Sequence, residues 1–288
     1  MKPFITIIGM ALASSVAVQG QVALLETFDG GGVNSTYNVT VTSGATAPAV
    51  MSGGPTENFL RVTYLEQSNN RSVAWDYVPI GGKQVGIYFD FRMTDDAANA
   101  GAGGCCGQAA DGLGIGLFST ATYGMTGGIN PGDGNEWENS AFDDALVLHF
   151  DIFDSGGGQG TPDGNQAKLT WNGSLLINAT PSFEINNNVF NRAALILSDA
   201  GSDSVASLRL IEDVNGAAVI HDVFQVTVPG LDLDAGALPY RLIVGGRTGG
   251  AYHNGDLDNI VITGVPEPAT YALVGLGFGL LALLRRKR

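Results

Sequence analysis

The sequence predicts an all-β protein that folds as a two-sheet antiparallel jelly-roll sandwich. Charged residues are only 15% of the 288 residues, while glycine accounts for 42, about twice its usual share. Hydrophobic residues reach 44%, enough for a sizeable core. Short apolar or alternating runs follow one another, separated by Gly, Asn, Asp and Pro, and no helical period appears between the two ends. About a dozen such runs without an internal repeat favour a sandwich over a propeller or solenoid.

The clearest of these runs is Ile87–Arg92, where strict alternation places Ile87, Phe89 and Phe91 on one face of a strand. No linker divides the region, so residues 21–264 are expected to form one domain. The expected strands are Phe59–Tyr64, Val73–Val78, Val85–Met93, Leu113–Ser119, Ala145–Phe153, Ala167–Trp171, Ser174–Asn178, Arg192–Leu197, Val205–Glu212, Ala218–Val228, Tyr240–Val244 and Leu257–Thr263.

Both ends of the chain resemble targeting segments. Residues 1–20 combine Lys2 with an apolar run from Phe4 to Val18, the pattern of a secretory signal peptide; a buried N-terminal helix is the alternative. At the other end, residues 265–288 contain Pro266-Glu267-Pro268, an apolar stretch over 271–284 that predicts a transmembrane helix, and the basic end 285–288. The basic end favours a tail whose terminus stays cytoplasmic while the domain faces outward.

The net charge of −14 argues against a nucleic-acid partner. Of the 14 basic residues, five lie in the two end segments, so the middle of the chain is still more acidic than the whole. Phosphate backbones require a basic footprint, whereas an acidic surface permits cation binding and favours solubility.

The last 24 residues resemble the PEP-CTERM sorting signal of Gram-negative bacteria. That signal has the same three parts, a Pro-Glu-Pro motif (here Pro266, Glu267 and Pro268), a Gly/Leu-rich helix and an Arg-rich terminus. The resemblance implies export through the inner membrane by the secretion machinery and recognition by an exosortase, with cleavage near Pro266–Pro268. It also implies a final place at the cell surface, in the outer envelope or in the matrix of a bacterium that makes exopolysaccharide.

Three segments in the middle resemble concanavalin A-like lectin and glucanase domains. The first is Ala110-Asp111-Gly112 followed by an apolar strand, the second is 148–154 with Asp163 and Gln166 beyond it, and the third is 244–250 followed by 257–262. In L-type lectins the Asp of the first segment accepts sugar hydroxyls. The resemblance therefore implies a carbohydrate site built from Asp111, Gly112, Arg247, Gly249 and Gly250.

The second segment departs from the lectin metal strand. His149 stands where these lectins have Glu, and Gln166 stands where they have His, so a full two-metal site is not expected. A single Ca²⁺ held by Asp151, Asp154, Asp163 and the carbonyl of Phe153 remains one reading, because Ca²⁺ prefers oxygen ligands. A solvated acidic loop is the other.

The same strand argues against glucanase chemistry. A retaining glycosidase needs two carboxyl groups about 5–5.5 Å apart, one of them a nucleophile. His149 occupies the nucleophile position and the shorter Asp154 the acid/base position, so no catalytic residues are expected. His149 can equally be a core-facing or hydrogen-bonded histidine.

Two other features stay open. Cys105 and Cys106 are adjacent among glycines, so they form a strained vicinal disulfide, bridges between molecules or two free thiols. Trp137, in an acidic loop, either stacks on a sugar ring or packs the loop. The leading hypothesis is an exosortase-processed surface protein whose domain binds a glycan without catalysis. The alternatives are a structural matrix protein without a sugar site and a divergent glycoside hydrolase.

Overall fold

A computed structural model describes residues 21–42, 44–94, 110–130, 137–138, 142–153, 164–214, 216–234 and 236–264. Residues 1–20, Cys105, Cys106, Asp154, Asp163 and the tail from 265 onward lie outside this part, and with them the predictions made for the signal peptide, the disulfide and the C-terminal helix. Among the described residues, no helix is long and apolar enough to cross a membrane.

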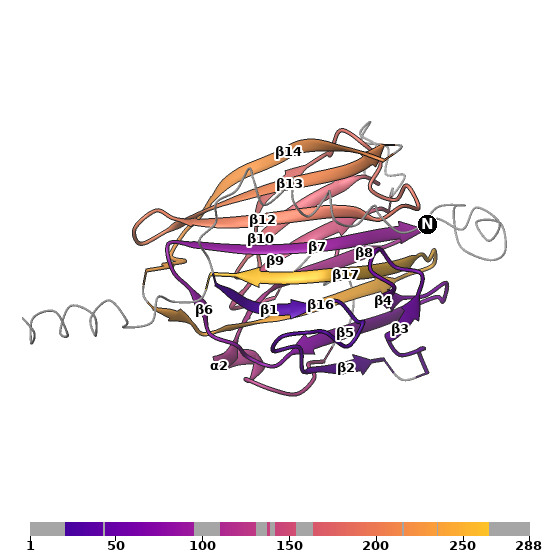
Figure 1. Ribbon diagram of the computed structural model, residues 1–288, viewed down its shortest axis with the longest axis horizontal. Coiled ribbons are helices and arrows are strands. Elements are labelled where there is room, and N and C mark those ends of the chain that lie inside the picture. Colours follow the sequence, from indigo (N-terminus) through magenta and orange to yellow (C-terminus); the bar gives the residue numbers. More distant parts are fainter. Residues whose placement is uncertain are drawn as a thin grey trace, which may run out of the picture.

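Two large antiparallel sheets lie face to face (Figure 1). The eight-stranded sheet runs in the order β14 (Ala217–Val228), β13 (Ser204–Val214), β12 (Asn191–Asp199), β7 (Gln84–Thr94), β17 (Asn254–Thr263), β4 (Asn58–Thr63) and β3 (Ala49–Ser52), with β1 (Val22–Glu26) paired to β17.

The seven-stranded sheet runs in the order β11 (Ser174–Ala179), β10 (Gln166–Trp171), β9 (Ala145–Asp151), β8 (Gly112–Ser119), β16 (Tyr240–Thr248), β5 (Asn69–Trp75) and β2 (Tyr37–Val41). A small third sheet pairs β6 (Ile80–Gly81) with β15 (Ala237–Leu238), and the short helix α2 (Thr120–Tyr123) follows β8. The expected two-sheet, all-β fold is confirmed.

The main core lies between the two large sheets, as the alternation of apolar residues requires. Phe89 and Phe91 of β7 face inward and meet Phe150 of β9, with ring centroids 6.2 and 4.5 Å apart. Because successive residues of a strand point to opposite faces, Tyr88, Asp90 and Arg92 of the same strand face outward. The inward-facing set fixes the register of every strand around it.

Each of the twelve expected strands corresponds to a strand in the structure, but some limits were wrong. β5 begins at Asn69 and ends at Trp75 rather than Val78, and β9 ends at Asp151 rather than Phe153. β16 continues to Thr248, so Arg247 lies on a strand and not in a loop. Six elements were not predicted from the sequence, namely β1, β2, β3, β6, β15 and α2. β2 and β3 are exposed or half-buried along their whole length, and β6 and β15 are two residues each, so none carries a strong apolar pattern.

Candidate functional site

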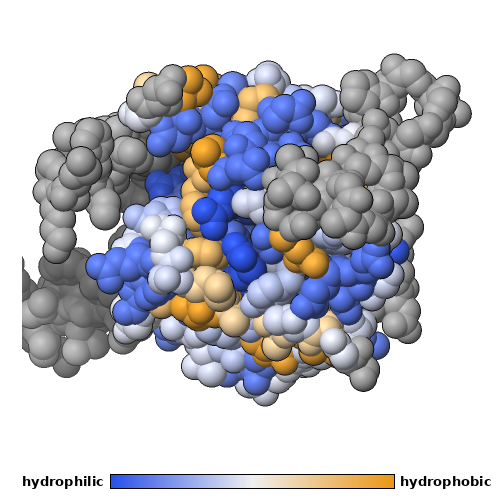
Figure 2. Space-filling view, turned by 90° about the vertical axis from the view of Figure 1, so that its right-hand side faces the viewer, coloured by the Kyte–Doolittle hydropathy of each residue, from blue (hydrophilic) through white to orange (hydrophobic). Residues whose placement is uncertain are grey.

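Five charged side chains gather at one end of the seven-stranded sheet, on the face turned away from the main core. Asp151 of β9, Lys168 of β10 and Arg247 of β16 point to this outer face, because their neighbours Phe150, Leu169 and Gly246 point inward. Asp111, which directly precedes β8, lies beside them. Glu138 lies there too, next to Trp137 on the outer face of the sheet. Figure 2 views this end of the sandwich and shows a band of strongly hydrophilic residues between apolar ones.

The backbone of Asp111 is held from three sides. Its N–H donates to the carbonyl of Arg247 (3.2 Å), and its own carbonyl accepts from the N–H of Ile152 (3.0 Å). The preceding carbonyl, that of Ala110, accepts from Nδ1 of His253 (2.6 Å), and the Ala110–Asp111 peptide is cis. His253 is fully buried, and this burial lowers its pKa to about 4, so the imidazole is neutral and Nδ1 carries the proton. Asp111 is therefore placed by backbone contacts to the end of β9 and the end of β16, and by the contact of the His253 side chain with the preceding carbonyl.

The carboxylates of Asp111 and Glu138 both face the Arg247 guanidinium. Nη1 of Arg247 lies 2.5 Å from Oε1 of Glu138 and 3.3 Å from Oδ2 of Asp111. Burial, followed by the charge of Asp111, raises the pKa of Glu138 to about 7. Burial likewise raises the pKa of Asp111, although Arg247 opposes the shift. Within the described part of the chain, Oδ2 of Asp111 and Oε2 of Glu138 are buried and accept no hydrogen bond. Neither oxygen thus has a hydrogen-bond donor among the described residues, although Oδ2 of Asp111 lies in the ion pair with Arg247.

Trp137 brings Glu138 to this position. The Trp137 ring is fully buried on the outer face of the sheet, against Phe118 and Phe142. It lies directly over Gly245 of β16 and Gly114 of β8, which are register partners in the sheet. A Cβ atom added at Gly245 would lie 2.1 Å from Cε2 of the ring, so only glycine leaves room for it. Of the two roles considered for Trp137, packing is the one that the structure shows, because the ring is buried against the sheet.

His149 holds the backbone of Trp137 in place. Its Nδ1 lies 2.8 Å from the carbonyl of Trp137 and its Nε2 lies 2.9 Å from the hydroxyl of Thr170. Since a carbonyl only accepts, Nδ1 donates and Nε2 accepts the hydroxyl proton. Complete burial lowers the pKa of His149 to about 4, so the ring is neutral. His149 is thus buried and hydrogen-bonded, which was one of the two interpretations of this residue from the sequence.

The glycine loop after β16 closes against Asp111. A Cβ at Gly249 would lie 2.9 and 3.0 Å from the two carboxylate oxygens of Asp111, so a side chain there would crowd them. The carbonyl of Gly249 accepts from the N–H of Ser68 (2.9 Å) and that of Gly250 accepts from Nε2 of Gln67 (3.2 Å), which ties the loop to the turn before β5. The structure therefore brings together Asp111, Gly112, Arg247 and Gly249 at one place, with Gly250 at its exposed edge.

Of the predicted metal ligands, the structure describes Asp151 and Phe153. Oδ1 of Asp151 accepts from the N–H of Phe153 (3.0 Å), and Oδ2 accepts from Nζ of Lys168 (2.7 Å). Asp154 and Asp163 belong to the loop that the structure does not describe. No three His, Cys, Asp or Glu side chains among the described residues converge closely enough to hold a metal ion. Asp151 and Lys168 form an ion pair with both side chains about 10% exposed.

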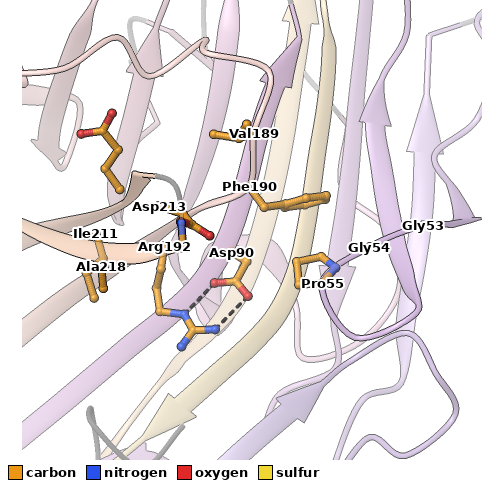
Figure 3. A pocket seen from close by; sticks show the side chains of 12 residues that line it. Gly53, Gly54, Pro55, Asp90, Val189, Phe190, Arg192, Ile211, Asp213 and Ala218 are labelled. Atoms are coloured by element: carbon orange, nitrogen blue, oxygen red, sulfur yellow. Dashed lines mark hydrogen bonds and ion pairs between the residues drawn. The ribbon is translucent and has the colours of Figure 1, made fainter. Parts of the chain in front are cut away.

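A separate hollow lies on the outer face of the eight-stranded sheet, away from Asp111. It has a volume of about 630 Å³, and its walls come from the loop 53–55, the segment 189–192 and β13. Figure 3 shows Asp90 and Arg192 facing one another there, joined by two hydrogen bonds of 2.6 and 2.9 Å. Glu212 and Asp213 add two further carboxylates to the wall of this hollow.

The comparisons with known proteins agree with the fold. The lumenal domain of VIP36, in a form bound to Ca²⁺ and Man3GlcNAc, is 13% identical, with a TM-score of 0.53 over 79% of this chain and 85% of that one. Peanut lectin with a nine-residue peptide is 12% identical, with a TM-score of 0.56 over 85% and 97%. Lectin I from Ulex europaeus, with the methyl glycoside of α-L-fucose, is 15% identical, with a TM-score of 0.52 over 84% and 97%.

The domain has the concanavalin A-like fold. Identities of this size establish the fold alone, so any assignment of a site depends on the geometry of this chain. Residues 264–288 match the PEP-CTERM protein-sorting motif, which confirms the resemblance found at the C-terminus and indicates export. No curated protein matches the sequence significantly.

Sequence reasoning missed two members of the site, Glu138 and Lys168. Glu138 was placed only in an acidic loop, and nothing in its spacing connects it to Arg247, which is 109 residues away in the chain. Lys168 carried a signal that could have been used. A single basic residue alternates with apolar ones on a strand paired to the Asp151 strand, and such a residue invites a search for an acidic partner.

Proposed function

We propose that the protein is an exported, lectin-like surface or matrix protein that binds a glycan at the Asp111 end of its sandwich, without catalysis. The main support is the Asp111 carboxylate, which is fixed through its backbone while Oδ2 accepts no hydrogen bond from the described residues. Sugar hydroxyls are hydrogen-bond donors of the kind that such an acceptor needs. Arg247 adds donors beside it, and loops at the end of a rigid sandwich are a common place for binding sites.

The test is glycan binding by the purified protein and by D111A. We would measure co-sedimentation with insoluble polysaccharides, including the exopolysaccharide of the producing bacterium. D111A should weaken binding at least tenfold, because a lost charged hydrogen bond is worth about 1.5–3 kcal/mol. D222A is the matched control, since Asp222 is 77% exposed and lies on β14, outside the site. Equal loss in both variants, or no binding by the native protein, would count against the proposal.

A non-catalytic role is part of the proposal. His149 at the nucleophile position is neutral and hydrogen-bonded at both nitrogens, and Asp151 already accepts hydrogen bonds at both oxygens. These contacts support binding over hydrolysis. The check is an assay for reducing ends after prolonged incubation with each bound polysaccharide. Their appearance, and its loss in D151N or E138Q, would replace this proposal with a glycoside hydrolase.

For the C-terminal segment we propose recognition by an exosortase in a Gram-negative bacterium, with cleavage near Pro266–Pro268. The match of residues 264–288 to the sorting motif supports this step. Mass spectrometry of the protein recovered from the cell surface and from the medium should find a C-terminus close to Glu267. Recovery of the protein with Arg288 intact from both fractions would contradict it.

A further inference from the structure

Asp151 is the one predicted Ca²⁺ side-chain ligand that the structure describes, and a cation already lies against it. The ammonium group of Lys168 is 2.7 Å from Oδ2 of Asp151, while Oδ1 accepts the N–H of Phe153. Lys168 is on β10 and lies diagonally across the strand pair, because Gln166 is the direct partner of Asp151 and His149 that of Lys168. Both side chains point to the outer face and are largely shielded from water.

The described residues do not fit Ca²⁺ at this position. Calcium takes six to eight oxygen ligands at about 2.3–2.6 Å, so an ion on Oδ2 would lie within a few ångströms of the lysine nitrogen. Like charges at that separation repel strongly where water is scarce. Binding the metal would require Lys168 to leave Asp151 and its place on the sheet.

We propose that the Lys168 ammonium takes the place of the divalent cation of the lectin fold, so that the Asp111 site is organised without a metal. The inference rests on the glycan-binding function proposed above and gives it a mechanism. The metal-bound VIP36 structures show only that the fold accommodates Ca²⁺ in another protein, since a metal-free VIP36 structure gives an almost equal match, with a TM-score of 0.55 against 0.54.

The ion pair acts on the site through the end of β9. Asp151 is the register partner of Gly112, and the next residue, Ile152, donates its N–H to the carbonyl of Asp111. Lys168 and Phe153 together fix the Asp151 side chain and the chain that follows it. Lys168 is therefore a positioning residue, which orders the strand end that holds Asp111.

The experiment compares K168M with K168R and K83M in the purified protein. Methionine keeps most of the apolar stem of lysine and removes the charge, whereas arginine keeps the charge. K83M is the matched control, because Lys83 is 76% exposed and its partners among the described residues, Asp199 at the end of β12 and Asp234, lie away from Asp151. Each variant is unfolded by heat and tested for glycan co-sedimentation, with Ca²⁺, with Mn²⁺ and with chelator. Calorimetry measures binding of Ca²⁺ and Mn²⁺ alone to the native protein.

We expect the native protein to bind neither metal stoichiometrically, and its melting temperature and glycan binding to be the same with metal and with chelator. K168M should melt at least about 5 °C lower than K83M, because it removes the neighbouring cation from a shielded carboxylate. K168M should also bind glycan at least tenfold more weakly, with K168R closer to the native protein.

Stoichiometric metal binding that is lost in D151N would overturn the inference, even if K168M fails to fold. Equal melting temperatures for K168M and K83M would also overturn it. The melting and metal measurements need no glycan, so they decide the role of Lys168 separately from the proposed function. A third outcome is that no glycan and no metal binds while K168M alone is destabilised. In that case the inference that Lys168 replaces the metal stands, and the glycan-binding proposal fails.

Discussion

Replacement of Gly245 by alanine tests how the fold places Glu138 in the site. The added Cβ would lie 2.1, 2.2 and 2.4 Å from three atoms of the Trp137 ring. Ordinary contacts between carbon atoms are about 3.5–4 Å, so the ring must move by about 1.4 Å. It has little freedom to do so, because Phe142 lies across it with a centroid distance of 4.9 Å and the ring is fully buried.

The expected cost follows from these contacts. A methyl group forced into a packed site costs about 1–3 kcal/mol, and complete loss of a buried tryptophan costs about 3–5 kcal/mol. We therefore expect G245A to lower the free energy of unfolding by about 2–3 kcal/mol. Because Glu138 follows Trp137 directly, displacement of the ring also moves the Glu138 carboxylate away from Arg247. Glycan binding should fall with stability.

The assay is urea unfolding of G245A, W137A and the double variant, followed by circular dichroism. If the clash with Trp137 is the cause, G245A costs almost nothing in the W137A background, and the coupling between the two changes is about 1–3 kcal/mol. G31A is the matched control, since a Cβ at the exposed Gly31 meets nothing closer than 4.0 Å. Additive effects of G245A and W137A, or a G245A protein as stable as G31A, would refute the reasoning.

Three further predictions follow from buried charges. Because the pKa of Glu138 is raised to about 7, the folded protein holds a proton that the unfolded chain releases above about 4.5. The contribution of Glu138 to stability should therefore fall as pH rises from 4.5 to 7, and between pH 5 and 8 the free energy of unfolding of the native protein should fall relative to that of E138Q by at most about 3 kcal/mol. Burial lowers the pKa of His149 and of His253 to about 4, so as pH falls through 6.5 the unfolded chain takes up these protons before the folded protein does. Each histidine should therefore lower the free energy of unfolding by up to about 3 kcal/mol between pH 6.5 and 4, and H149Q or H253Q should each remove one such loss. An unchanged dependence of stability on pH in these variants would contradict the burial of neutral histidines. R192M leaves the buried Asp90 without its bidentate partner and should lower the free energy of unfolding in urea by about 1–3 kcal/mol. R209M breaks an exposed pair with Asp222 and should lower it by less than about 1 kcal/mol. Equal effects of the two variants would contradict the difference in burial between the two ion pairs.

The sequence by itself determined the fold class and the sorting motif at the C-terminus. Alternation such as that of Ile87, Phe89 and Phe91 is a local property, and it settles which face of a strand is buried wherever one face meets the core. The same logic placed Asp111 before a strand and Gly249 in a loop. It failed for β3, whose four residues are all exposed, because a strand at the edge of a sheet can be held by backbone pairing without an apolar face.

Only the tertiary structure decided how the site is assembled. Arg247 reaches Glu138, and Lys168 reaches Asp151, across distances in the chain that no local pattern encodes. Gly114 and Gly245 look like ordinary strand glycines until β8 and β16 are paired and the Trp137 ring is laid across them. The physical reason is that charge pairing and ring packing depend on which strands become neighbours and in what register. Local apolar periodicity fixes neither of these, and the sheet as a whole fixes both.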